Sequence, residues 1–132
     1  MQSRIASINR LKSKKAKVSC HYFIDRKGQT IGMVDEKKIA WHAGKSRWKN
    51  FTDLNKNSIG IELVNKGHEF GYEKFTNIQI KKLISLCLYL KKKYTIKNSN
   101  IIGHSDIAPT RKKDPGEKFP WEKLSKNKIG IW

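Results

Sequence analysis

The amino-acid sequence predicts an α/β domain, and three observations lead to this fold class. Runs rich in β-branched and aromatic residues, typical of strands, occur at 18–25, 30–34 and 58–64. A longer segment that starts at 77 keeps the apolar spacing of a helix. Strands that alternate with helices indicate an α/β layered architecture. With 132 residues the chain has room for one core, so we expect a single domain over residues 1–132.

The first elements expected along the chain are a helix and a β-hairpin. Apolar residues recur at spacings of three over 3–11, which favours a short amphipathic helix. The stretches 18–25 and 30–34 follow, separated by the turn-like sequence Arg-Lys-Gly-Gln at 26–29. Two strand-like runs joined by such a short turn predict a hairpin.

The middle of the chain contains a long loop and a strand with an unusual residue. Periodicity is lost over 35–57, and a loop of this length inside a compact domain is usually functional. The apolar run 58–64 then predicts a strand, but Glu62 lies within it. A charged residue in an otherwise apolar strand is a local contradiction, and such contradictions concentrate at working sites.

The most clearly predicted helix begins after Thr76. Thr76 and Gln79 have the spacing of a capping box, in which each residue bonds the other's backbone N–H. The apolar residues that follow keep helical spacing: Ile80, Leu83, Ile84, Cys87 and Leu90. Beyond this helix we expect a short strand at 100–103 and a polar loop at 110–118.

Charge alone does not identify a partner. The chain has 29 Lys and Arg against 11 Asp and Glu, a net charge of +18, which raises a polyanion such as nucleic acid as a partner. The basic residues are mostly Lys and are spread along the chain, so a coding bias toward Lys explains them better. We therefore predict no nucleic-acid partner.

Two further classes of feature are not predicted. Cys20 and Cys87 are too few for a disulfide framework or a paired-cysteine metal site, and we expect both to be buried apolar residues. The N-terminal stretch 1–17 has no apolar core of the kind found in signal peptides. No apolar run is long enough to span a bilayer.

Five polar residues are candidates for chemistry: His42, Glu62, His104, Lys112 and Asp114. Taken singly, each has an ordinary structural explanation, such as a turn former, a structural histidine or a paired carboxylate. Together they suit a hydrolytic metal site. Imidazole and carboxylate groups bind zinc, a separate carboxylate takes a proton from water, and a nearby ammonium stabilises an oxyanion.

Five sequence blocks, in order, resemble the N-acetylmuramoyl-L-alanine amidase family of bacteria. The peptidoglycan-recognition proteins of animals are more distant members of the same group. The blocks are SCHYFIDRKG at 19–28, AWHAG at 40–44, NSIGIEL at 57–63, GHSDIAP at 103–109 and RKKDPG at 111–116. The resemblance covers most of the chain and implies a central mixed β-sheet flanked by helices, with a zinc ion in a shallow cleft.

The resemblance also implies roles for the candidate residues. His104 and Asp114 match two zinc ligands, Glu62 matches the catalytic carboxylate, and Lys112 matches the lysine that steadies the transition state. His42 lies in a block similar to a cleft-facing loop and is a candidate substrate contact. The reaction implied is zinc-dependent hydrolysis of the amide bond between N-acetylmuramic acid and L-alanine in peptidoglycan or muropeptides.

The chain departs from the family pattern at the first zinc ligand. Relatives carry this histidine at the end of an opening strand, and the matching strand would precede Met1. We therefore expect a domain that lacks its first strand and is incomplete at the N-terminus. His21 and His68 are weaker candidates for the missing ligand. With two ligands in place of three, zinc should be held weakly.

This departure leaves two alternatives to an active amidase. One is a non-catalytic peptidoglycan-binding module, and the other is an inactive fragment of a split amidase. The sequence leaves open whether the substrate is intact wall or recycled fragments, whether the protein works in the cytoplasm or the cell envelope, and what its oligomeric state is.

Overall fold

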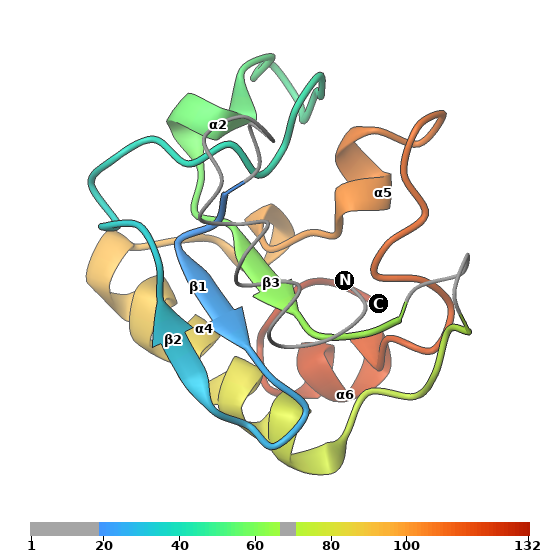
Figure 1. Cartoon of the computed structure of the whole chain (residues 1–132). Coiled ribbons are helices and arrows are strands. Elements are labelled where there is room, and N and C mark those ends of the chain that lie inside the picture. The colour runs from blue at the N-terminus through green and yellow to red at the C-terminus, as the bar shows by residue number, and fades with distance from the viewer. Residues whose placement is uncertain (1–18, 67–70) are drawn as a thin grey trace.

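The computed structural model describes residues 19–66 and 71–132, which form a small mixed sheet surrounded by helices (Figure 1). The elements, in chain order, are β1 (Tyr22–Ile24), β2 (Thr30–Gly32), α2 (Leu54–Asn57), β3 (Ile61–Leu63), α4 (Asn77–Tyr94), the 3-10 helix η1 (Asn98–Asn100), α5 (His104–Ile107) and α6 (Trp121–Lys126). The predicted α/β class is confirmed.

The sheet has the strand order β2-β1-β3 and is mixed, as the resemblance implied. Strand β1 pairs antiparallel with β2, with Phe23 opposite Ile31. It pairs parallel with β3 on its other side, with Phe23 opposite Glu62. Among the described residues, Glu62 therefore lies in the middle of an edge strand, beside the fully buried Phe23 of β1.

The predicted hairpin is confirmed, with shorter strands than the sequence runs indicated. Its turn is closed by Asp25, whose carboxylate accepts hydrogen bonds from the backbone N–H groups of Lys27 (3.0 Å) and Gln29 (2.8 Å). Gly28 takes the left-handed conformation that this turn needs, with φ of +83°. The buried aspartate thus replaces backbone hydrogen bonds that the tight turn cannot make.

The main core joins the sheet to α4 and α6. Its buried residues come from all three elements and from the segments on either side of α6: Ile24, Ile80, Leu83, Cys87, Phe119, Leu124 and Ile129. A second cluster beneath β1 contains Cys20, Phe23 and Val64. Both cysteines are buried and free, as predicted, and burial raises the pKa of each thiol to about 12.

Helix α4 begins with the predicted capping box. The Thr76 hydroxyl accepts a hydrogen bond from the Gln79 N–H (3.2 Å), and the Gln79 side-chain oxygen accepts one from the Thr76 N–H (3.3 Å). The Gln79 amide nitrogen donates to the carbonyls of Ile24 (3.2 Å) and Val64 (3.0 Å). One fully buried side chain therefore joins the helix start to the ends of β1 and β3.

Other sequence predictions differ from the structure. No strand forms at 100–103, because the Ile101 N–H donates to the Asn98 carbonyl (3.2 Å) and closes the turn of η1 instead of joining the sheet. The predicted loop 35–57 ends in the short helix α2, and α6 was not predicted. The helix expected at 3–11 lies outside the described residues.

No helix in the described parts of the chain combines the length and apolar character that crossing a bilayer requires.

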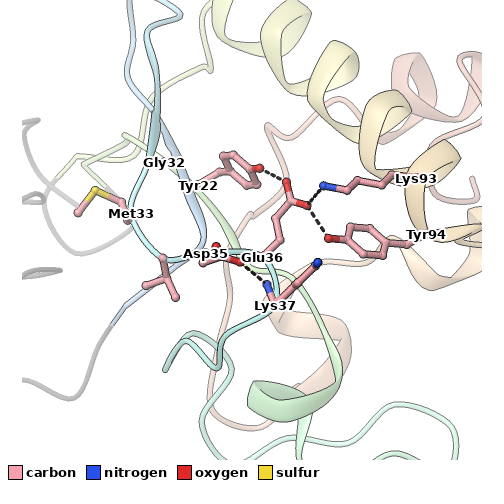
Figure 2. A pocket seen from close by; sticks show the side chains of 9 residues that line it. Tyr22, Gly32, Met33, Asp35, Glu36, Lys37, Lys93 and Tyr94 are labelled. Atoms are coloured by element: carbon pink, nitrogen blue, oxygen red, sulfur yellow. Dashed lines mark hydrogen bonds and ion pairs between the residues drawn. The ribbon is translucent and has the colours of Figure 1, made fainter.

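A recess of about 640 Å³ lies between the segment that follows β2 and the C-terminal end of α4 (Figure 2). The Glu36 carboxylate lies at its centre and accepts hydrogen bonds from the hydroxyls of Tyr22 and Tyr94 and from the Lys93 ammonium (2.8 Å). These donors, Lys93 foremost, lower the pKa of Glu36 to about 2. The cluster satisfies its own polar groups and fastens the hairpin to α4.

We expect Gln79→Leu to destabilise the fold by roughly 2 to 3 kcal/mol, because it removes the Gln79 donor from the buried Val64 carbonyl, one of two donors from the Ile24 carbonyl, and half of the capping box. Urea denaturation measures this loss. Lys81→Leu makes a change of similar size on the exposed face of the same helix and should stay within about 0.5 kcal/mol of the native chain. Equal stability of Gln79→Leu and the native protein would refute the bridging role.

The Glu36 cluster predicts a dependence of stability on acid. The folded pKa of Glu36 is about 2, below the ordinary value of 4.5, so its stabilising effect is complete above pH 4.5 and is lost as the pH falls toward 2. Glu36→Gln should therefore be less stable than the native chain at pH 7, with the gap closing below pH 4.5. Thermal melts at several pH values measure it. A gap that is unchanged at pH 2.5 would contradict the assignment.

Candidate functional site

His104 and Asp114 face each other across two separate segments of the chain. His104 is the first residue of α5, and Asp114 lies in the loop before α6. The His104 Nδ1 atom is 3.3 Å from Asp114 Oδ2. The other ring nitrogen, Nε2, is 2.9 Å from the Ala43 carbonyl oxygen. A carbonyl only accepts hydrogen bonds, so Nε2 carries the proton, and the neutral ring presents the Nδ1 lone pair to the carboxylate.

This pair has the spacing and chemistry of two zinc ligands. Two ligands of a tetrahedral zinc at about 2.0 to 2.1 Å from the metal are about 3.3 to 3.4 Å apart. A backbone carbonyl on the second ring nitrogen is the usual support for a metal-binding histidine. Burial opposes ionisation of both groups, yet Asp114 raises the pKa of His104, and His104 lowers the pKa of Asp114. The two groups together therefore favour a cation between them.

Backbone contacts hold the two segments together. The Ser105 N–H donates to the Asp114 carbonyl at 2.8 Å. Gly103, directly before His104, lies against Pro115, directly after Asp114, and a Cβ on Gly103 would be 2.5 Å from the Pro115 Cδ atom. Only glycine permits this approach, so the residue type at 103 sets the distance between the two candidate ligands.

Glu62 enters the site from β3. Its carboxyl has a raised pKa, with burial as the main cause and the Asp114 charge adding to it. The charges of His104 and Lys112 act on Glu62 in the opposite direction. Lys112 is placed by a turn in which its N–H donates to the Ala108 carbonyl (2.8 Å).

The structure thus brings four of the five predicted residues close enough for their charges to affect one another's pKa values: Glu62, His104, Lys112 and Asp114. They come from β3, the start of α5 and the loop beyond it. Figure 1 shows α5 on the β3 side of the sheet, away from β2. The recess around Glu36 contains none of these residues.

His42, the fifth predicted residue, lies next to this group. Its backbone N–H and that of Ala43 both donate to the Asn55 side-chain oxygen (3.0 and 2.7 Å), which ties the loop to α2. The ring packs against Gly60, where a Cβ would be 2.3 Å from the His42 Cγ atom. Burial and the nearby His21 lower the pKa of His42 to about 4, so the ring is neutral at pH 7. Its contact with substrate stays a prediction.

A third protein ligand is not evident among residues 19–66 and 71–132, where no group of three His, Cys, Asp or Glu side chains is arranged to hold a metal ion. His21 does not fill this place, because both of its ring nitrogens are in use. Nδ1 accepts a hydrogen bond from the Gly60 N–H (3.0 Å), and Nε2 donates to the Lys38 carbonyl (2.8 Å). His68 lies outside the described residues.

Sequence reasoning missed the backbone and side-chain groups that support the site. The Ala43 carbonyl and Arg111 lie within the conspicuous blocks at 40–44 and 111–116, but a carbonyl carries no sequence signal of its own. Asn55 belongs to α2, which is too short to show a helical period in the sequence. The blocks themselves were the only available signal.

We expect Gly103→Ala to weaken zinc binding by about tenfold or more, because the added methyl group must displace Pro115 and with it Asp114. Calorimetric titration of each protein with zinc measures the affinity. Gly32→Ala is the matched control, since a Cβ at Gly32 has no neighbour within 4 Å. The spacing argument fails if Gly103→Ala binds zinc as tightly as the native chain.

The known proteins to which this chain is similar are amidases that share one type of name. The chain is 41% identical to N-acetylmuramoyl-L-alanine amidase AmiD of Escherichia coli strain K12, over 87% of this chain and 46% of the relative. It is 38% identical to 1,6-anhydro-N-acetylmuramyl-L-alanine amidase AmpD of Haemophilus influenzae, over 81% of this chain and 56% of the relative. The chain thus spans about half the length of the curated relatives it matches.

Solved structures agree with this result. The complex of E. coli AmiD with anhydro-N-acetylmuramic acid-L-Ala-D-gamma-Glu-L-Lys superposes with a TM-score of 0.91 at 38% identity, covering 99% of this chain and 55% of that one. AmpDh3 of Pseudomonas aeruginosa superposes with a TM-score of 0.93 at 34% identity, covering 98% and 57%. Residues 2–117 match the family described as N-acetylmuramoyl-L-alanine amidase. The chain belongs to the N-acetylmuramoyl-L-alanine amidase family.

Proposed function

We propose that this protein hydrolyses the amide bond between N-acetylmuramic acid and L-alanine in peptidoglycan or muropeptides, with zinc as its cofactor. The observation that carries the proposal is the 3.3 Å approach of His104 Nδ1 and Asp114 Oδ2, with the half-buried carboxyl of Glu62 within reach of their charges. A metal-ligand pair next to a separate carboxyl group is the arrangement that metal-assisted amide hydrolysis requires.

The relatives support the choice of substrate class. The E. coli AmiD structure contains an anhydromuramoyl tripeptide, and a second AmpDh3 structure contains an anhydromuramic pentapeptide. Both molecules have a muramic acid joined to a peptide. Family membership and this likeness make the same bond the best candidate for the present chain.

His104 and Asp114 would hold the zinc through Nδ1 and a carboxylate oxygen. When bound, zinc acts as a Lewis acid that polarises the substrate carbonyl and lowers the pKa of water. The Ala43 carbonyl keeps Nδ1 unprotonated in the neutral ring and thus available. The described residues supply two ligands, and a catalytic zinc in proteins usually has three.

Glu62 would move the proton. As the water oxygen attacks the lactyl carbonyl carbon, the Glu62 carboxylate accepts a proton from that water. When the C–N bond breaks, Glu62 returns the proton to the amino nitrogen of L-alanine. A raised pKa suits both steps, because the group then holds and releases a proton closer to neutral pH. The Lys112 ammonium would stabilise the negative charge on the carbonyl oxygen.

A second candidate is a peptidoglycan-binding module without catalysis. The presence of only two candidate ligands among the described residues favours it. In that case Glu62 and Lys112 serve as substrate contacts, and the chain binds muropeptides without cleaving them. Mass spectrometry of an anhydromuramoyl tripeptide incubated with the protein and zinc distinguishes the two candidates.

We expect Glu62→Gln to lower the rate of cleavage on the order of 100- to 10,000-fold, because the amide keeps the shape of the carboxylate but cannot accept the proton. Zinc affinity and melting temperature should stay close to native values. Glu122→Gln, an exposed carboxylate of α6, should cleave at the native rate. Activity within about tenfold of native would remove Glu62 from the proton path.

The zinc content of the purified variants tests the assignment of the metal ligands. His104→Ala and Asp114→Ala should each lose zinc, whereas Glu62→Gln keeps it. If both alanine variants retain stoichiometric zinc, the ligand assignment is wrong. If the native chain binds the tripeptide with zinc present and never cleaves it, the binding module is the correct function.

A further inference from the structure

Arg111 donates to the same carbonyl that fixes His104. Its Nη2 atom is 2.9 Å from the Ala43 oxygen and 2.7 Å from the Lys45 oxygen. His104 Nε2 is also 2.9 Å from the Ala43 oxygen. A carbonyl oxygen has two lone pairs, so these two donors saturate it. The Ala43 carbonyl is therefore held from one side by a guanidinium and from the other by the candidate zinc ligand.

The surrounding backbone is built to admit the guanidinium. Gly44 has a φ of +64°, and a Cβ at this position would be 3.0 Å from Arg111 Nη2. The N–H groups of Arg111 and Lys112 both lie within hydrogen-bond distance of the Ala108 carbonyl (3.0 and 2.8 Å). One turn therefore carries both the arginine that reaches the Ala43 loop and the lysine whose charge acts on Glu62.

A second bond joins the same two segments. The Arg47 N–H donates to the Ile107 carbonyl at 2.8 Å, so the loop remains attached to α5 at its far end without Arg111. At its near end the guanidinium bonds the Ala43 and Lys45 carbonyls, and Asn55 accepts from the Ala43 N–H. Loss of Arg111 should thus remove one of the two donors to the Ala43 carbonyl while leaving the rest of the loop in place.

We propose that Arg111 is a positioning residue of the metal site: it anchors the Ala43 carbonyl, which in turn keeps the His104 ring protonated at Nε2 and free at Nδ1. The inference rests on the proposed zinc function. Charge-assisted hydrogen bonds from arginine are strong and directional, and partners of this kind typically change metal affinity 10- to 100-fold when removed.

Charge and position predict opposite effects at this site. Removing a cation near a metal site should strengthen zinc binding if only charge matters. Removing the anchor of the Ala43 carbonyl should weaken binding, because the His104 ring then loses its fixed tautomer and orientation. The direction of the change therefore distinguishes the two roles.

The experiment compares Arg111→Ala, Arg111→Lys and Arg47→Ala in the full chain. We expect the zinc dissociation constant of Arg111→Ala to rise about 10- to 100-fold, measured by calorimetry. Arg111→Lys should recover most of the affinity, because an ammonium can still donate to both carbonyls. Arg47→Ala removes an equal charge from the loop that carries Ala43 without touching the Ala43 carbonyl and should stay within about twofold of native.

A second readout needs no metal. Nitrogen-15 spectra of the His104 ring, recorded at a pH where the ring is neutral, report which nitrogen carries the proton. The native chain should show the Nε2–H form, and Arg111→Ala should show a mixture. An unchanged ring spectrum with an unchanged or tighter zinc constant in Arg111→Ala would overturn the inference. A native chain that binds no zinc overturns the proposed function instead, and the ring spectra then still decide the role of Arg111.

Discussion

The approach of two electron-rich atoms, His104 Nδ1 and Asp114 Oδ2, to 3.3 Å is the constraint that the rest of the site serves. Two lone pairs at this distance repel each other unless a proton or a metal ion lies between them. Contacts of the backbone around the two residues keep these atoms close together. Gly103 lies against Pro115, and the Ser105 N–H bonds the Asp114 carbonyl. The two atoms are thus held at a distance that a proton or a bound cation between them favours.

The fold supplies the third part of the site, Glu62, through a different set of contacts. Glu62 lies on a three-residue strand, and such a short strand has few ladder hydrogen bonds of its own. Gln79 compensates by holding the Val64 carbonyl at the end of β3 and the Ile24 carbonyl at the end of β1. The position of the carboxyl therefore depends on a helix cap some distance along the chain, and stability and chemistry are coupled through one buried amide.

Local patterns predicted the elements that local chemistry determines. The hairpin and α4 were found because a turn sequence and the Thr76–Gln79 capping box act within a few residues. The strand expected at 100–103 was wrong because the Ile101 N–H has a closer partner, which periodicity does not reveal. The four-residue helices α2 and α5 are too short to show a period.

The residues of the site also fall into those that the sequence predicted and those that it did not. Glu62, His104, Lys112 and Asp114 were found from ordered sequence blocks, and the structure places them together. The Ala43 carbonyl and its anchor could not be found, because the direction of a carbonyl depends on tertiary contacts alone.

The central claim is that the His104–Asp114 pair holds a metal ion. Anomalous diffraction at the zinc edge, from crystals grown with zinc, measures this directly. We expect a peak about 2.0 to 2.2 Å from His104 Nδ1 and from an Asp114 carboxylate oxygen. Zinc bound elsewhere on the protein, with no peak between these two residues, would contradict the account.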